Sequence, residues 1–101
     1  MRNFLEITEI SIKQLRMILK DSIHLKKLRI GSYKGAMDSE PVLSDMVVAL
    51  LFKKPSTRTR FSFEVGIAQM GGKSISVSSK EMQLSNSEKM SDTSRVLSNY
   101  V

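Results

Sequence analysis

The chain has 101 residues, of which 41% are hydrophobic, so it can form one small domain with a modest core. Lys and Arg total 16 against 10 Asp and Glu, which gives a net charge of +6. A positive charge favours anionic ligands. The basic residues are not interleaved with aromatic ones, which argues against a nucleic-acid partner. The absence of cysteine excludes disulfides and thiolate metal sites, and we find neither a secretory leader nor a membrane-length apolar run, so we expect a soluble cytoplasmic protein without a membrane partner.

The first expected element is a helix from about Ile12 to about Arg29. Ser11 and Gln14 have the spacing of a capping box, in which each side chain accepts a hydrogen bond from the other residue's backbone N–H. Apolar residues follow at helical spacing, and Gly31 stands where a helix stop is common. The segment 31–44 contains two glycines and a proline, so we expect a polar loop there.

A strand is expected next, over Asp45 to Phe52. Its unbroken apolar run is typical of a strand buried on both faces in a parallel sheet. Pro55 ends the strand, and Ser56 is a good N-cap because its hydroxyl can accept a hydrogen bond from the first helical turn. We expect a helix from Ser56 to Met70 that is apolar around much of its girth and therefore well buried.

The remaining elements complete an alternating pattern. Gly71 and Gly72 end the central helix, and Lys73 to Val77 alternates polar and apolar residues as a second strand would. A polar segment follows, and a final helix is expected from about Glu88. The order helix, strand, helix, strand, helix predicts an α/β fold with a parallel sheet and a right-handed crossover.

The start of the central helix has the composition of a phosphate site. A helix N-terminus presents unpaired N–H donors and the positive end of the helix dipole. Hydroxyl donors come from Ser56, Thr57 and Thr59, and Arg58 can supply two parallel donors to two phosphate oxygens. Arg58 and Arg60 point to nearly opposite sides of a helix, so we expect Arg58 to bind the ligand and Arg60 to form a structural ion pair. The alternative is an ordinary capped helix with two exposed arginines.

The pattern Phe52-x-x-Pro-Ser-Thr-Arg-Thr-Arg-x-Ser-Phe-Glu64 resembles the carbamoyl-phosphate signature of the aspartate/ornithine carbamoyltransferase family. The segments that follow at the family's spacing are Gly71-Gly72, Ser78-Ser79-Lys80, Met82-Gln83-Leu84 and Asp92 to Leu97. The Met82-Gln83-Leu84 segment and the ending Arg95 to Ser98 are similar to ornithine rather than aspartate carbamoyltransferases.

The resemblance implies the beginning of a three-layer carbamoyl-phosphate-binding domain, a homotrimer, and transfer of a carbamoyl group from carbamoyl phosphate to ornithine. It implies that carbamoyl phosphate is bound by Ser56, Thr57, Arg58 and Thr59, and by Gln83 reaching a neighbouring subunit's site. Arg58 would neutralise both the phosphate and the developing oxyanion. No metal or organic cofactor is implied.

The chain also departs from the family pattern. Family members are far longer, so we expect a truncated domain over residues 1–101, with the ornithine-binding domain absent and ornithine bound only where that domain is supplied. Ser85-Asn86-Ser87 stands where relatives usually have a glycine-containing segment. Two hypotheses remain open: part of an ornithine carbamoyltransferase, or a non-catalytic remnant that at most binds anions or another protein.

Overall fold

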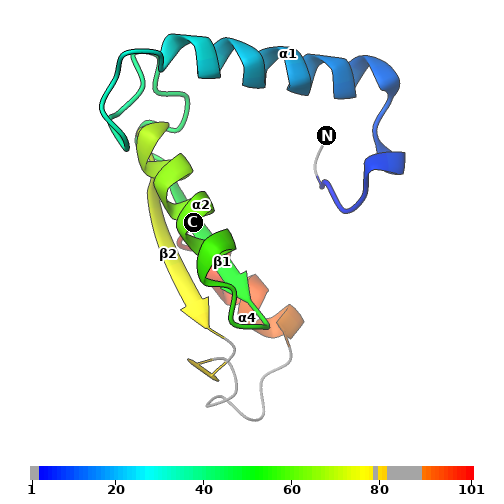
Figure 1. Cartoon of the computed structure of the whole chain (residues 1–101). Helices are drawn as coiled ribbons and strands as arrows, with labels where there is room; N and C mark the ends of the chain where they lie inside the picture. Colours follow the sequence, from blue (N-terminus) through cyan, green and yellow to red (C-terminus); the bar gives the residue numbers. More distant parts are fainter. Residues whose placement is uncertain (1–2, 79, 82–89) are drawn as a thin grey trace. The chain divides into compact units, whose positions relative to one another are not determined.

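A computed structural model describes residues 3–78, 80–81 and 90–101 of the chain. The chain divides into two compact units, Met1–Tyr33 and Lys34–Val101, whose elements are drawn in Figure 1. The fold is of the α/β class with a two-stranded parallel sheet, as the order of the elements predicts.

The first unit is built around a single long helix. A 3-10 turn, η1 (Ile7–Glu9), precedes helix α1 (Ile12–Leu28). The predicted capping box is confirmed: the Gln14 N–H donates to the Ser11 hydroxyl at 3.1 Å, and the Ser11 N–H donates to the Gln14 side-chain oxygen at 3.0 Å. Gly31, with φ of 84°, follows the helix end as the sequence indicates.

The second unit is organised around strands β1 (Val47–Phe52) and β2 (Lys73–Ser78), which pair in parallel. The register runs from Val47 opposite Lys73 to Phe52 opposite Ser78, so both strands end at one edge of the sheet. Helix α2 (Thr57–Gln69) connects them and runs along one face of the sheet (Figure 1). The predicted parallel pairing is therefore confirmed, whereas the right-handed crossover stays a prediction.

The loop before β1 is hydrogen-bonded to the C-terminal end of α2. The Asp38 N–H donates to the Gln69 carbonyl at 2.7 Å, and the Leu43 N–H donates to the Met70 carbonyl at 2.8 Å. Gly71 lies here with φ of 87°, and a Cβ at this position would come within 2.8 Å of the Pro41 Cβ. A glycine is required for both reasons, and the chain can then turn directly into β2.

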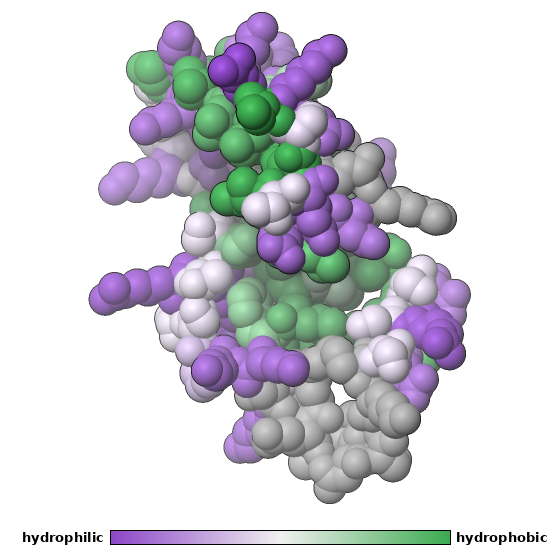
Figure 2. All heavy atoms as spheres, turned by 90° about the vertical axis from the view of Figure 1, so that its right-hand side faces the viewer, coloured by the Kyte–Doolittle hydropathy of each residue, from purple (hydrophilic) through white to green (hydrophobic). Residues whose placement is uncertain are grey.

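The predicted burial of the central helix is wrong for this chain. Among the described residues of α2 only Ile67 is buried, while Phe61 and Phe63 are each 54% exposed. β1 is half-buried along its whole length rather than fully buried. The physical reason is that α2 packs mainly against β2, and the face of a sheet covers only one side of a helix. Figure 2 accordingly shows apolar side chains at the surface of the molecule.

The last described element is helix α4 (Met90–Leu97). It contains an ion pair between Asp92 and Arg95, whose Oδ1 and Nη1 atoms lie 4.0 Å apart. The sequence places the start of this helix near Glu88, which lies outside the described residues, as does the polar loop 82–87. No helix in the described part of the chain is long and apolar enough to cross a membrane.

Candidate anion-binding site

A cavity of about 330 Å³ lies where β1 and β2 end and α2 begins. In open α/β sheets, ligands bind outside the carboxyl ends of the strands, which is the position of this cavity. Its walls come from the segment after β1, the first turn of α2 and the end of β2. The polar residues that line it are Lys54, Ser56, Thr57, Arg60, Ser76, Ser78, Lys80 and Glu81.

The structure brings together part of the predicted site. Ser56 and Thr57 line the cavity, as the phosphate-site interpretation requires. Arg58 and Thr59 are exposed on α2 and are not among the lining residues, so their contact with a ligand stays a prediction. Gln83 lies outside the described residues.

Ser56 occupies the N-cap position of α2, but the predicted capping hydrogen bond is absent. The backbone explains the difference. Ser11, which does cap its helix, has ψ of 158°, whereas Ser56 has ψ of 76° and φ of −148°. The Ser56 carbonyl still accepts the first helical bond, from the Arg60 N–H at 2.9 Å. The Ser56 hydroxyl and the first N–H groups of α2 are therefore not committed to each other, and both can donate to an anion.

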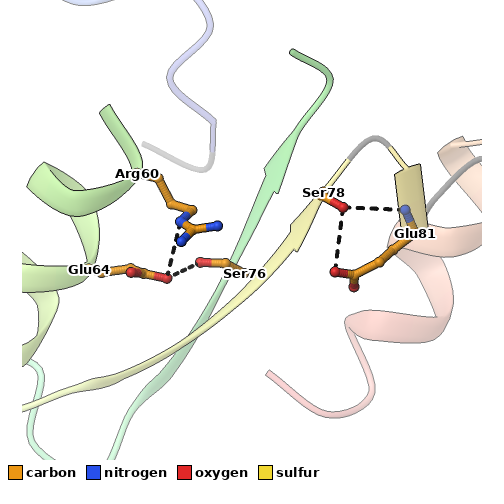
Figure 3. A network of polar contacts seen from close by, with 5 residues as sticks. All are labelled: Arg60, Glu64, Ser76, Ser78 and Glu81. Atoms are coloured by element: carbon orange, nitrogen blue, oxygen red, sulfur yellow. Dashed lines mark hydrogen bonds and ion pairs between the residues drawn. The ribbon is translucent and has the colours of Figure 1, made fainter. Parts of the chain in front are cut away.

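Arg60 forms the ion pair expected of it. Its Nε lies 3.9 Å from Oε1 of Glu64, one turn further along α2, and the same carboxylate oxygen accepts a hydrogen bond from the Ser76 hydroxyl on β2. Figure 3 shows the Glu64 carboxylate joined on one side to the Arg60 guanidinium and on the other to the Ser76 hydroxyl. Arg60 also lines the cavity, whereas Arg58 does not, so the assignment of the ligand-binding role to Arg58 rather than to Arg60 stays a prediction.

The spacing of residues could have identified this role for Arg60. Residues three and four apart lie on the same face of a helix. Arg60 is three residues after Thr57 and four after Ser56, and all three line the cavity. The spacing of Arg58 and Arg60 by itself does not indicate that Arg60 shares a cavity with the Ser56 and Thr57 hydroxyls.

At the end of β2, Ser78 and Glu81, which both line the cavity, are hydrogen-bonded to each other. The Glu81 N–H donates to the Ser78 hydroxyl at 3.3 Å, and that hydroxyl lies 3.4 Å from the Glu81 carboxylate (Figure 3). The charged lining residues are three cations and one carboxylate: Lys54, Arg60, Lys80 and Glu81. The cavity therefore carries a net positive charge that favours an anionic ligand.

Comparison with known proteins gives a consistent match. The family model for the carbamoyl-P binding domain of aspartate/ornithine carbamoyltransferase matches residues 2–101. Ornithine carbamoyltransferase from Cereibacter sphaeroides is 46% identical over 101 residues, covering 100% of this chain and 33% of that protein. The enzyme from Rhodopseudomonas palustris is 44% identical over 100 residues, covering 99% and 31%. The chain thus spans about a third of the length of the curated relatives it matches.

Two solved structures show the same fold. Ornithine carbamoyltransferase from Pyrococcus furiosus matches with a TM-score of 0.84 and 35% identity, covering 99% of this chain and 30% of that one. The catalytic subunit of aspartate transcarbamoylase from M. jannaschii matches with a TM-score of 0.83 and 27% identity, covering 100% and 32%. The chain therefore has the fold of the corresponding part of both kinds of carbamoyltransferase.

Proposed function

Because the chain belongs to the aspartate/ornithine carbamoyltransferase family and matches its carbamoyl-P binding domain, we propose that it supplies the phosphate-binding part of an ornithine carbamoyltransferase. Such an enzyme transfers the carbamoyl group of carbamoyl phosphate to ornithine, releasing phosphate and forming citrulline. The observation that carries this proposal is the positively charged cavity at the carboxyl ends of the strands, lined by Ser56 and Thr57. Ornithine is preferred to aspartate because the curated relatives at 44–46% identity bear that name.

The residues have distinct roles in this proposal. The hydroxyls of Ser56, Thr57 and Thr59 hold the phosphate group together with the first N–H groups of α2. Arg58 neutralises the charge that builds on the phosphate and on the carbonyl oxygen, and Gln83 adds a contact to the carbamoyl phosphate. Fixed donors of this kind stabilise developing charge without reorganising during the reaction.

The wider organisation is part of the same proposal. Residues 1–101 form part of the carbamoyl-phosphate-binding domain, and ornithine binds where the ornithine-binding domain of the family is supplied. The family resemblance supports a homotrimer in the cytoplasm. A second candidate is a non-catalytic module that binds anions or another protein, and the exposed aromatic side chains of α2 favour it.

An NMR titration with inorganic phosphate and then carbamoyl phosphate tests the site. We expect amide shifts concentrated at Thr57 to Arg60, because the N–H groups of this segment start α2 beside the cavity. Shifts spread over surface lysines, with none at this segment, would refute the proposed binding site. Binding of phosphate but not of carbamoyl phosphate would favour the non-catalytic module.

A further inference from the structure

We propose that Arg60 is a second cation of this anion site, and that Glu64 and Ser76 are positioning residues that hold its guanidinium at the cavity. The inference rests on the proposed function, since it adds residues to the same site. Its starting point is that Arg60 and Ser76 both line the cavity, although they come from a helix and from a strand.

The first step concerns which nitrogens of the Arg60 guanidinium are used by Glu64 and which remain for an anion. Its ion pair with Glu64 uses Nε, and it is the one ion pair of Arg60 within the described residues. A guanidinium has five N–H donors in a planar fork. The pair with Glu64 therefore leaves the two terminal nitrogens to donate to an anion beside Ser56 and Thr57. Arginine bound in this way can contact two oxygens of one phosphate.

The second step is the link between α2 and β2. Oε1 of Glu64 accepts a hydrogen bond from the Ser76 hydroxyl and also faces Nε of Arg60 (Figure 3). The Glu64 side chain is 31% exposed and that of Arg60 48% exposed, so the pair is partly shielded from water. Because Ser76 belongs to the sheet, it fixes the carboxylate relative to the cavity rather than only relative to the helix.

The third step distinguishes this arrangement from an ordinary surface ion pair. An exposed pair one turn apart on a helix contributes little to stability because both side chains lose freedom to form it. In this site, the restriction of the Arg60 side chain by Glu64 also affects anion binding. An arginine already held at the site gives up less side-chain entropy when an anion binds than a free arginine does. The network therefore raises the affinity for anions even where it adds little to stability.

The test is phosphate titration of the parent chain and of Arg60→Lys, Glu64→Gln and Ser76→Ala, with Arg58→Lys and Arg95→Lys for comparison. Binding is monitored through the amide signals of residues 57–60 and the Arg60 Nε–H signal. Arg60→Lys keeps the charge and loses the fork, so we expect binding about tenfold weaker. Ser76→Ala keeps both charges of the ion pair but loosens it, so we expect binding about threefold weaker. Glu64→Gln loosens Arg60 too but also removes a negative charge near the anion, so for this variant the Arg60 Nε–H signal, and not the affinity, is the readout. In both, phosphate should shift the Arg60 Nε–H signal less than in the parent.

Arg95→Lys is the matched control. Arg95 has the same kind of helical ion pair, with Asp92, but does not line the cavity, so its replacement should leave phosphate binding unchanged. Circular dichroism of each variant separates a change at the site from a loss of fold, and Ser76→Ala tests the link from β2 without altering the helix.

The outcomes separate this inference from the proposed function. Weaker binding in Arg60→Lys and Ser76→Ala, and a smaller phosphate-induced shift of the Arg60 Nε–H signal in Glu64→Gln, with folded protein and an unchanged Arg95→Lys, support the network. Binding at Thr57 to Thr59 that Arg58→Lys weakens and Arg60→Lys does not would overturn the inference while leaving the proposed function standing. No perturbation of this segment in the parent would overturn both.

Discussion

Replacing Gly71 by alanine should destabilise the second unit strongly. Gly71 has φ of 87°, a conformation that costs a residue with a Cβ about 1–2 kcal/mol. The added Cβ would lie 2.8 Å from the Pro41 Cβ, and relieving such overpacking costs about 1–3 kcal/mol. Alanine also lowers the conformational entropy of the unfolded chain, which offsets about 0.4–1 kcal/mol of this destabilisation. We therefore expect Gly71→Ala to lower the free energy of unfolding by about 1–4.5 kcal/mol.

Urea denaturation followed by far-UV circular dichroism measures this change, with Gly66→Ala as the matched control. Gly66 lies within α2, and no atom would come within 4 Å of an added Cβ there. Alanine should raise helix stability at this position by about 0.5–1 kcal/mol. The two Gly→Ala variants should thus change stability in opposite directions. A Gly71→Ala variant as stable as the parent would show that the contact between the loop and the end of α2 is not the constraint argued above.

Three other predictions concern the site and the chain as a whole. Arg58→Lys should weaken phosphate binding by about 1.5–3 kcal/mol in a titration, because it removes the fork of donors; an unchanged affinity would remove Arg58 from the site. The chain alone should form no citrulline from ornithine and carbamoyl phosphate, since it spans about a third of its relatives' length and the reaction needs the amine held in line for attack; turnover by pure protein in a colorimetric assay would contradict this. The isolated chain should be marginally stable or aggregation-prone, because Phe61, Phe63 and Ile75 are exposed beside an open two-stranded sheet; a sharp, reversible thermal transition of a monodisperse monomer would contradict that.

Features set by local chemistry could be predicted from the sequence. The capping box of Ser11 and Gln14 depends on two side chains three residues apart, and it forms as expected. The strands were placed to within two residues because an apolar run and an alternating run are both local signals. Parallel pairing followed from the helix between them, since such a connection returns the chain to the same edge of the sheet.

Features that depend on a partner could not be predicted in the same way. The apolar residues of α2 indicate a helix that is able to be buried, but Phe61 and Phe63 are exposed because the sheet has only two strands to cover them. The link from Ser76 to Glu64 joins residues 12 apart, and no local pattern marks it. The position of Arg60 at the cavity could have been predicted from the sequence, because residues three and four apart share a helix face and Arg60 has this spacing from Thr57 and Ser56.

Ser11 and Ser56, the N-cap residues of α1 and α2, show how a helix start can serve either stability or binding. An N-cap hydrogen bond stabilises a helix by about 1 kcal/mol, and Ser11 obtains that stabilisation for α1. Ser56 has the same side chain at the same helical position but a backbone ψ of 76°, and α2 forgoes the bond. That loss leaves a hydroxyl and several N–H donors at the wall of a positively charged cavity. A bound phosphate can recover more than the capping bond would supply, because hydrogen bonds to a charged group contribute about 1.5–3 kcal/mol each. The first turn of α2 should therefore become more ordered when phosphate binds, which slower amide hydrogen exchange at Thr57 to Arg60 would detect.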